Sequence, residues 1–147
     1  MPEKPINQSV IDSVRALQWT GNALRVLDQR KLPGSVEYQD FHTAAGVAEA
    51  IKSMRVRGAP AIGIAAAYGV VLAAQARHVE NSGEWQELVK QDFQVLAASR
   101  PTAVNLFWAL DKMRVAIAAG GNDPDSLLSI ARSIHCLLYT SPSPRDS

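Results

Sequence analysis

The feature that most constrains this fold is a stretch without charged residues, Gly58–Gln75, which reads GAPAIGIAAAYGVVLAAQ. A segment dominated by alanine, glycine and aliphatic residues is stable as a helix only when neighbouring elements cover it on all sides. Its length reaches that of a membrane span, but Pro60 and the many small residues favour the interior of a soluble bundle. We therefore predict a buried core helix over about 60–77, around which the remaining elements pack.

The residues before this helix have the pattern of short strands. Two turn sequences, TGN at 20–22 and PG at 33–34, separate three short apolar segments. We predict a three-stranded antiparallel meander between about 14 and 41. Its apolar positions are Leu17, Trp19, Leu24, Val26, Val36 and Tyr38.

From Thr43 onward the apolar residues are spaced by three and four, which is typical of helices. Thr43 is placed to cap the first helix, Gly120-Gly121 to end the fourth, and Asp123-Pro124 to begin the fifth. We predict helices near 43–54, 60–77, 84–98, 103–119 and from 123 onward. The predicted fold class is therefore α+β, a small antiparallel sheet followed by a helical bundle.

Composition and charge limit what the chain can bind. Its 147 residues are enough for one domain, and 47% hydrophobic with 20% charged residues is typical of a soluble globular protein. The net charge is 15 − 14 = +1, so no overall field attracts nucleic acid or an anionic membrane. The N-terminal residues lack the apolar core of a signal peptide, so we expect a cytoplasmic protein whose anion sites are local.

The start of the core helix is the first candidate anion site. Pro60 has its φ already set for a helix start, and the main-chain amides of Ala61 and Ile62 are expected to point outward there. Gly58 lets a ligand approach the main chain closely. Arg57 offers a planar set of donors that suits phosphate oxygens. The competing interpretation is a solvated loop before a helix.

A second arginine stands before a second helix. Arg100 precedes Pro101 and Thr102, and Thr102 is the expected cap of the helix near 103–119. Two such helix starts could face one pocket. By itself Arg100 is equally compatible with a structural role on the surface.

We expect no metal site. His42 and His78 have no partner at the spacing of metal ligands. The only cysteine, Cys136, opens the segment CLLYTSPSPRDS, which matches the translation of a transposase sequencing adapter. We therefore predict that 136–147 is an adapter-derived tail and that the natural sequence stops near His135.

Three segments carry a resemblance to a known enzyme family. ALQWTGNALRVLDQRKLPGSVEY, MRVRGAPAIGIAAAYGVVLAA and SRPTAVNLFWALDKM follow one another as in the N-terminal domain of S-methyl-5-thioribose-1-phosphate isomerases, which the chain resembles over about 14–135. Residues 1–13 are left as a flexible N-terminus. Related sugar-phosphate isomerases share the RGAPAIG and SRPT motifs, whereas LDQRKLP is particular to the methylthioribose family.

The resemblance implies an aldose–ketose isomerase of methionine salvage, which converts S-methyl-5-thioribose 1-phosphate into S-methyl-5-thioribulose 1-phosphate. Members are cofactor-free homodimers with a Rossmann-like C-terminal domain that holds the catalytic cysteine and aspartate. That domain is missing here, so the resemblance implies an inactive fragment without catalytic residues. It also implies that Arg57, Gly58, Ala59 and Arg100 bind the phosphorylated sugar.

Two alternatives remain open from the sequence. A ribose-1,5-bisphosphate isomerase would share both arginine motifs and differ in the pocket opposite the phosphate. The regulatory subunit of the eukaryotic translation-initiation nucleotide-exchange factor shares the fold and would be a binding module. The intact RGAPAIG and SRPTAVN segments favour an enzyme.

Overall fold

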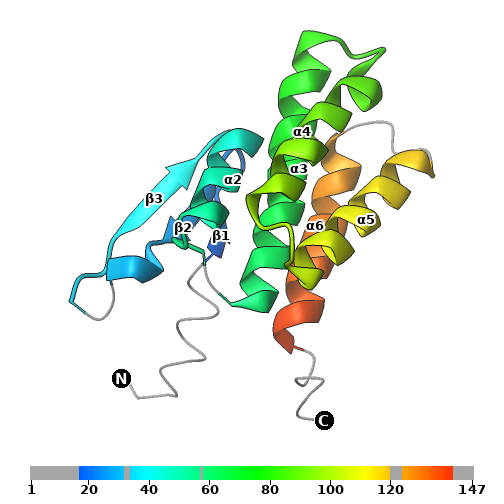
Figure 1. The fold of residues 1–147 in the computed structure, drawn as a ribbon. Coiled ribbons are helices and arrows are strands. Elements are labelled where there is room, and N and C mark those ends of the chain that lie inside the picture. The colour runs from blue at the N-terminus through cyan, green and yellow to red at the C-terminus, as the bar shows by residue number, and fades with distance from the viewer. Residues whose placement is uncertain (1–16, 32–33, 57, 120–123, 141–147) are drawn as a thin grey trace.

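The computed structural model describes residues 17–31, 34–56, 58–119 and 124–140. Several sequence predictions lie outside these residues: the flexible N-terminus, Arg57, the Gly120-Gly121 helix end and the Asp123 cap. Figure 1 shows a small sheet with one helix beside it and a cluster of longer helices next to them, which confirms the predicted α+β class.

The predicted meander is present as three antiparallel strands, β1 (Leu17–Trp19), β2 (Leu24–Leu27) and β3 (Tyr38–Phe41), in the order β1-β2-β3. The turn between β1 and β2 is closed by the Thr20 amide, which donates to the Ala23 carbonyl at 3.0 Å. A short 3-10 helix, η1 (Gln29–Lys31), follows β2.

The side of β3 that faces the core is not the side predicted from the apolar residues Val36 and Tyr38. Val36 lies outside the strand and is 67% exposed, and Tyr38 is also exposed. Pairing with β2 places Gln39 opposite Val26 and Phe41 opposite Leu24, so residues 39 and 41 share the side of the buried β2 residues. The register of the β2–β3 pairing therefore decides which side of β3 is covered. The covered side is the opposite of the one that the alternation of Val36 and Tyr38 predicts.

The five predicted helices are present in the described part of the chain: α2 (Ala44–Lys52), α3 (Ala59–Glu80), α4 (Trp85–Ser99), α5 (Val104–Ala118) and α6 (Pro124–Thr140). Thr43 caps α2 as predicted, because its Oγ1 accepts the Gly46 amide at 2.9 Å. Helix α6 continues beyond His135, and Leu138 packs against the core. The adapter origin of 136–147 stays a prediction.

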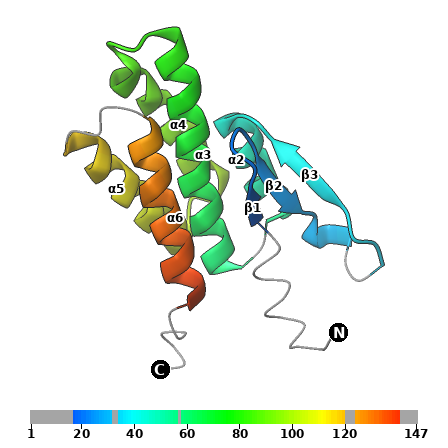
Figure 2. The same ribbon diagram turned by 180° about the vertical axis from the view of Figure 1, so that it is seen from behind.

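Helix α3 is the centre of the molecule, and α2, α4, α5 and α6 all pack against it (Figures 1 and 2). Every residue from Ala61 to Ala74 is buried, which confirms the predicted core helix. By length and composition α3 is the one described helix that could cross a membrane, yet 78% of its most apolar window is buried within the fold. That burial is typical of a core helix.

Candidate anion-binding site

The two helix starts singled out in the sequence meet at one hollow of about 470 Å³, at the same end of the bundle (Figure 1). Three of the four predicted site residues line it, and the fourth, Arg57, lies outside the described residues. Helix α3 contributes its first turn, and the α4–α5 connection contributes the opposite wall. The lining residues are Gly58, Ala59, Ile62, Arg100, Thr102, Ala103, Val104 and Asn105.

The start of α3 depends on the backbone of Gly58. This residue is the N-cap and has φ = 93°, a left-handed conformation that L side chains rarely adopt. A Cβ added there would meet nothing within 4 Å, so backbone conformation rather than crowding requires the glycine. The space beside it is open toward the hollow, where a ligand can approach the main chain.

The amides available at this start differ in part from the prediction. The Ile62 amide is not free, because it donates to the Gly58 carbonyl at 3.0 Å as the first helical bond. Pro60 has no N–H. No described side chain caps this helix start, so the amides of Ala59 and Ala61 are the first-turn donors that a ligand could use. The first of these donors, the Ala59 amide, thus lies two residues before the first predicted one, the Ala61 amide.

The start of α5 also differs from the prediction. Thr102 is not the cap; the N-cap is Ala103, whose amide donates to the Arg100 carbonyl at 3.0 Å. This tight turn moves the helix start by one residue, and an alanine side chain cannot accept a hydrogen bond from the first amides. The amides of Val104 and Asn105 are thus uncapped by any described side chain. The positive end of α5 faces the hollow, and none of the described residues that line it is an Asp or a Glu.

Arg100 is half-buried and makes no ion pair within the residues that the structure covers. Arg25, Arg30 and Arg77, in contrast, each contact a carboxylate within 3.0 Å. A guanidinium left without a carboxylate at a hollow lined by helix starts is suited to bind an anion. The side chain of Asn105 also lines the hollow, and sequence reasoning missed it. Asn105 could have been found from the sequence by its place in the first turn of the predicted helix.

The spacing of the two helix starts is set by Gly63 on α3. A Cβ at this position would lie 3.0 Å from the main-chain oxygen of Asn105, which is tighter than most real Cβ contacts. Glycine therefore lets α5 approach α3 closely without displacing the backbone of Asn105. Gly63 thus contacts the backbone of Asn105, one of the residues that line the hollow.

Sequence reasoning also missed a buried carboxylate that lies near the segment preceding α3. Asp28, at the end of β2, is fully buried and accepts two hydrogen bonds from the Arg30 guanidinium, at 2.9 and 2.8 Å. These bonds hold the pKa of the Asp28 carboxyl below its usual range, although burial acts in the opposite direction. Arg55 Nε lies 4.0 Å from the same carboxylate. The signal was the Asp-x-Arg spacing in LDQRKLP.

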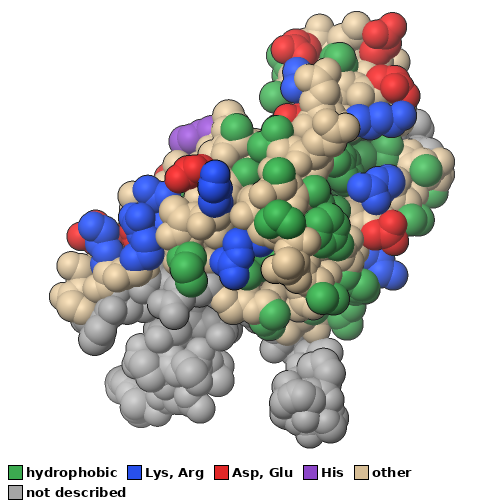
Figure 3. All heavy atoms as spheres, viewed as in Figure 1, with side chains coloured by type: hydrophobic (Ala, Val, Ile, Leu, Met, Phe, Trp, Pro, Cys, Tyr) green, Lys and Arg blue, Asp and Glu red, His purple; other side chains and the backbone are tan. Residues whose placement is uncertain are grey.

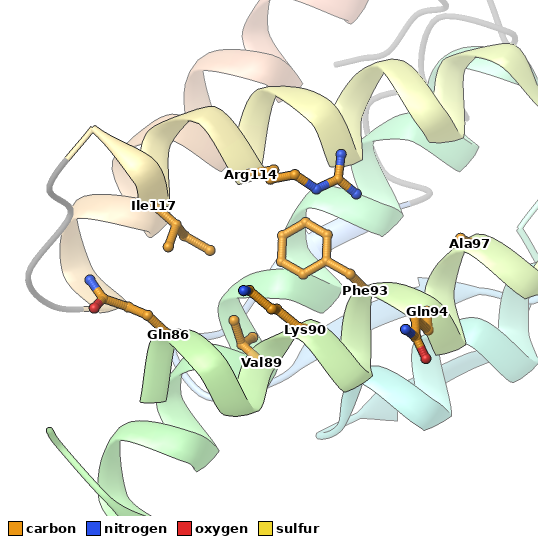
Figure 4. A pocket seen from close by; sticks show the side chains of 8 residues that line it. All are labelled: Gln86, Val89, Lys90, Phe93, Gln94, Ala97, Arg114 and Ile117. Carbon is orange, nitrogen blue, oxygen red and sulfur yellow. The ribbon is translucent and has the colours of Figure 1, made fainter. Parts of the chain in front are cut away.

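Another hollow, of about 280 Å³, lies between α4 and α5 and has different chemistry (Figure 4). Its wall is largely apolar, with Val89, Phe93 and Ile117, and Arg114 lies over the Phe93 ring at 5.1 Å. Its two cations, Lys90 and Arg114, already contact carboxylates. This hollow is less suited to an anion than the one at the helix starts.

Charges elsewhere on the surface are mixed. Figure 3 shows Lys and Arg side chains next to Asp and Glu side chains along the sheet edge and at the far end of the helices. With a net charge of +1, no face of this view presents a broad field of one sign. An anion at the hollow would therefore have to be held by the arginine and the amides that line it.

The match to known proteins covers the same residues. Residues 55–133 match the Initiation factor 2 subunit family, and this range contains both helix starts. The chain belongs to that family. It is 62% identical over 128 residues to the methylthioribose-1-phosphate isomerase of Methylococcus capsulatus, covering 86% of this chain and 36% of that protein. It is 52% identical over 120 residues to the enzyme of the same name from Alkalilimnicola ehrlichii, covering 82% and 35%.

Solved structures share the fold. The 5-methylthioribose 1-phosphate isomerase of Pyrococcus horikoshii OT3 has a TM-score of 0.69 and 37% identity, with 85% of this chain and 35% of that chain covered. The translation initiation factor eIF-2B, subunit delta, from A. fulgidus has a TM-score of 0.71 and 35% identity, covering 84% and 36%. The resemblance stated from the sequence is confirmed, and the chain spans about a third of the length of these relatives.

Proposed function

We propose that the hollow between the starts of α3 and α5 binds the phosphate of S-methyl-5-thioribose 1-phosphate, and that the complete protein isomerises this aldose to the ketose. One observation carries the proposal. Two helix starts that lack side-chain caps line the same hollow as Arg100, whose guanidinium makes no ion pair in the described chain. Each helix start favours an anion, and the arginine adds charge-assisted hydrogen bonds.

The chemistry of this substrate explains why firm phosphate binding matters. Carbon 1 carries the phosphate, so the sugar ring cannot open to a free aldehyde. Isomerisation then needs a proton or hydride to move between carbons 1 and 2, with a positioned acid and base and little water nearby. A phosphate held by the helix starts would fix carbon 1 relative to those groups. We assign no catalytic residue to this chain, so its share of the reaction is binding and orientation.

The isomerase is favoured over the translation factor by sequence rather than by fold. The TM-scores of 0.69 and 0.71 do not separate the two solved structures. Identity with isomerases reaches 62%, whereas it is 35% with the translation factor subunit. The relatives' names also favour methylthioribose phosphate over ribose bisphosphate as the substrate. A homodimeric state and a cytoplasmic location stay predictions.

Binding of phosphate and of the sugar phosphate to this chain tests the proposal. We expect inorganic phosphate to shift the amide NMR signals of Ala59, Ala61 and Val104. Arg100→Ala should weaken sugar-phosphate binding by about 1.5 to 3 kcal/mol, the usual scale of a charge-assisted contact. The same loss is predicted for Arg57→Ala. Isothermal titration calorimetry measures both, with the exposed Arg132→Ala on α6 as the matched control.

Unchanged affinity in Arg100→Ala, or an equal loss in Arg132→Ala, would remove Arg100 from the site. The 147-residue chain should bind the sugar phosphate without converting it. Measurable turnover by this chain would contradict the absence of catalytic residues. The full-length protein that carries this sequence should catalyse the isomerisation, and its Arg100→Ala variant should be impaired.

A further inference from the structure

We propose that Asp28 is a positioning residue for the phosphate site. Its buried carboxylate would act through Arg55 to fix the segment that delivers Gly58 and Ala59 to the start of α3. The inference rests on the proposed function, because it concerns how that site is held. Asp28 itself does not line the hollow.

The first step is the shape of the segment between α2 and α3. Met54 has φ = 70° and Gly58 has φ = 93°, so two left-handed residues lie within one short connection. At a non-glycine residue such as Met54, this conformation persists only where the surroundings hold it in place. Main-chain bonds hold the beginning of the connection, since the Met54 amide donates to Ile51 and the Val56 amide to Ala50, both at 3.2 Å.

The second step is the anchor in the middle of this segment. Arg55 is largely covered, with 21% of its side chain exposed, and its Nη1 donates to Ser53 Oγ at 2.7 Å. Its Nε is buried and has no hydrogen-bond partner. The Asp28 carboxylate, 4.0 Å away, is therefore the counter-charge that compensates for this covered guanidinium.

The third step is that Asp28 itself is held independently of the segment. The main-chain amide of Arg30 donates to its Oδ1 at 3.0 Å, and the Arg30 side chain completes the contact. The carboxylate stays charged, as its lowered pKa indicates, and its position is fixed by the sheet. Asp28 thus ties the segment before α3 to the end of β2.

The consequence for the site follows from the missing side-chain cap on α3. Gly58 offers no side-chain acceptor for the first amides of α3. The position of the first turn of α3 therefore depends on the preceding segment. Without the carboxylate, the covered Arg55 is left without a counter-ion and is expected to turn toward water. That movement would displace Gly58 and the amides of Ala59 and Ala61 relative to Arg100.

The test compares Asp28→Asn with Asp40→Asn in the 147-residue chain. Asp40 is the matched control, because it accepts two bonds from Arg25 at 2.9 and 3.2 Å on the same sheet but is exposed. Inorganic phosphate is titrated at constant pH and followed through the amide signals. We expect Asp28→Asn to weaken phosphate binding about fivefold or more and Asp40→Asn to leave it within about twofold.

A double-mutant cycle separates positioning from general stability. Arg55→Gln should cause the same loss of phosphate affinity as Asp28→Asn, and the double variant should lose no more than either one, because both remove one link. Arg55→Lys, which keeps the positive charge, should retain most of the phosphate affinity that Arg55→Gln loses. Urea unfolding of each variant identifies conditions in which it is fully folded.

The outcomes are distinct. Phosphate affinity that is unchanged in folded Asp28→Asn, or losses that add in the double variant, would overturn the positioning role and leave the proposed function intact. If Asp28→Asn does not fold, unchanged phosphate affinity in Arg55→Gln would likewise overturn the positioning role. If phosphate shifts no amide signals in the unsubstituted chain, the proposed function fails and the positioning role fails with it.

Discussion

Met54 contributes to this fold through its backbone more than through its side chain. Its φ of 70° is the one left-handed value at a non-glycine residue among the residues described, and its side chain is 44% exposed. A left-handed conformation costs an L-residue about 1 to 2 kcal/mol relative to glycine. The conformation is needed because the chain has to leave α2 and turn toward the start of α3.

We therefore expect Met54→Gly to raise the free energy of unfolding by about 1 kcal/mol. Little packing is lost, since the side chain is partly in water. Urea denaturation measures the change. Ala45→Gly, at an exposed position within α2, is the control and should lower stability by about 1 kcal/mol. A destabilised Met54→Gly variant would show that the methionine side chain matters more than its backbone strain.

At the level of elements, two glycines of α3 contact different kinds of atoms on neighbouring helices. At Gly63 an added methyl group would meet the main-chain oxygen of Asn105 at 3.0 Å, and a backbone atom cannot give way. At Gly69 the nearest atoms are the two methyl groups of Leu96, at 3.0 and 3.3 Å, which can rotate. The first glycine sets the distance between helices, whereas the second meets an adaptable side chain.

Gly63→Ala should therefore destabilise the fold by about 1 to 3 kcal/mol through overpacking, and it should weaken phosphate binding by shifting the start of α5. Gly69→Ala should be close to neutral, because the gain of about 1 kcal/mol in helix propensity offsets the adjustment of Leu96. Urea unfolding and phosphate titration compare the pair. Equal effects of the two substitutions would contradict the difference between backbone and side-chain contact.

For the molecule as a whole, an aromatic cluster around the buried Tyr68 joins the sheet to two helices. The Tyr68 hydroxyl on α3 is hydrogen-bonded to His135 Nδ1 on α6 at 2.9 Å, and Trp19 of β1 stacks on Tyr68 with ring centres 5.2 Å apart. Burial lowers the pKa of His135 below its usual value. The neutral imidazole is therefore the form that the fold favours.

This cluster predicts how stability depends on pH. Unfolded His135 titrates near its ordinary pKa of about 6.5, and the folded residue takes up its proton only at lower pH, so stability is fully present above about 6.5 and falls below it. His135→Gln, which can still bond Tyr68, should flatten this part of the curve. Asp28, whose pKa is also lowered, should add a further loss below about pH 4.

Urea midpoints recorded from pH 8 to pH 3 check both parts of the pH curve. Asp28→Asn should reduce the acid part and leave the change between pH 7 and 5.5 in place. An unchanged slope over that middle range in His135→Gln would show that another group causes it. The two substitutions thus separate the contribution of the cluster from that of the buried carboxylate.

Much of the fold was predictable because its signals are local. Turn residues such as Gly21 and the threonine cap at Thr43 act within one or two turns of chain, so they mark element boundaries from the sequence itself. The uncharged run around α3 can form stable structure only when it is buried, and it is. The arginine and glycine before that run, and Arg100 before α5, pointed to helix starts for the same local reason.

What only the tertiary structure decided involves residues far apart in the chain. Strand pairing turned Gln39 inward, and close packing at Gly63 brought the start of α5 beside that of α3. Asp28, after β2, met Arg55 in the segment between α2 and α3. Local propensity and periodicity cannot specify these relations, because register and the distance between helices depend on how buried side chains from separate elements fit together. The sequence by itself therefore determined the elements and the chemistry at their ends, and packing determined which ends meet.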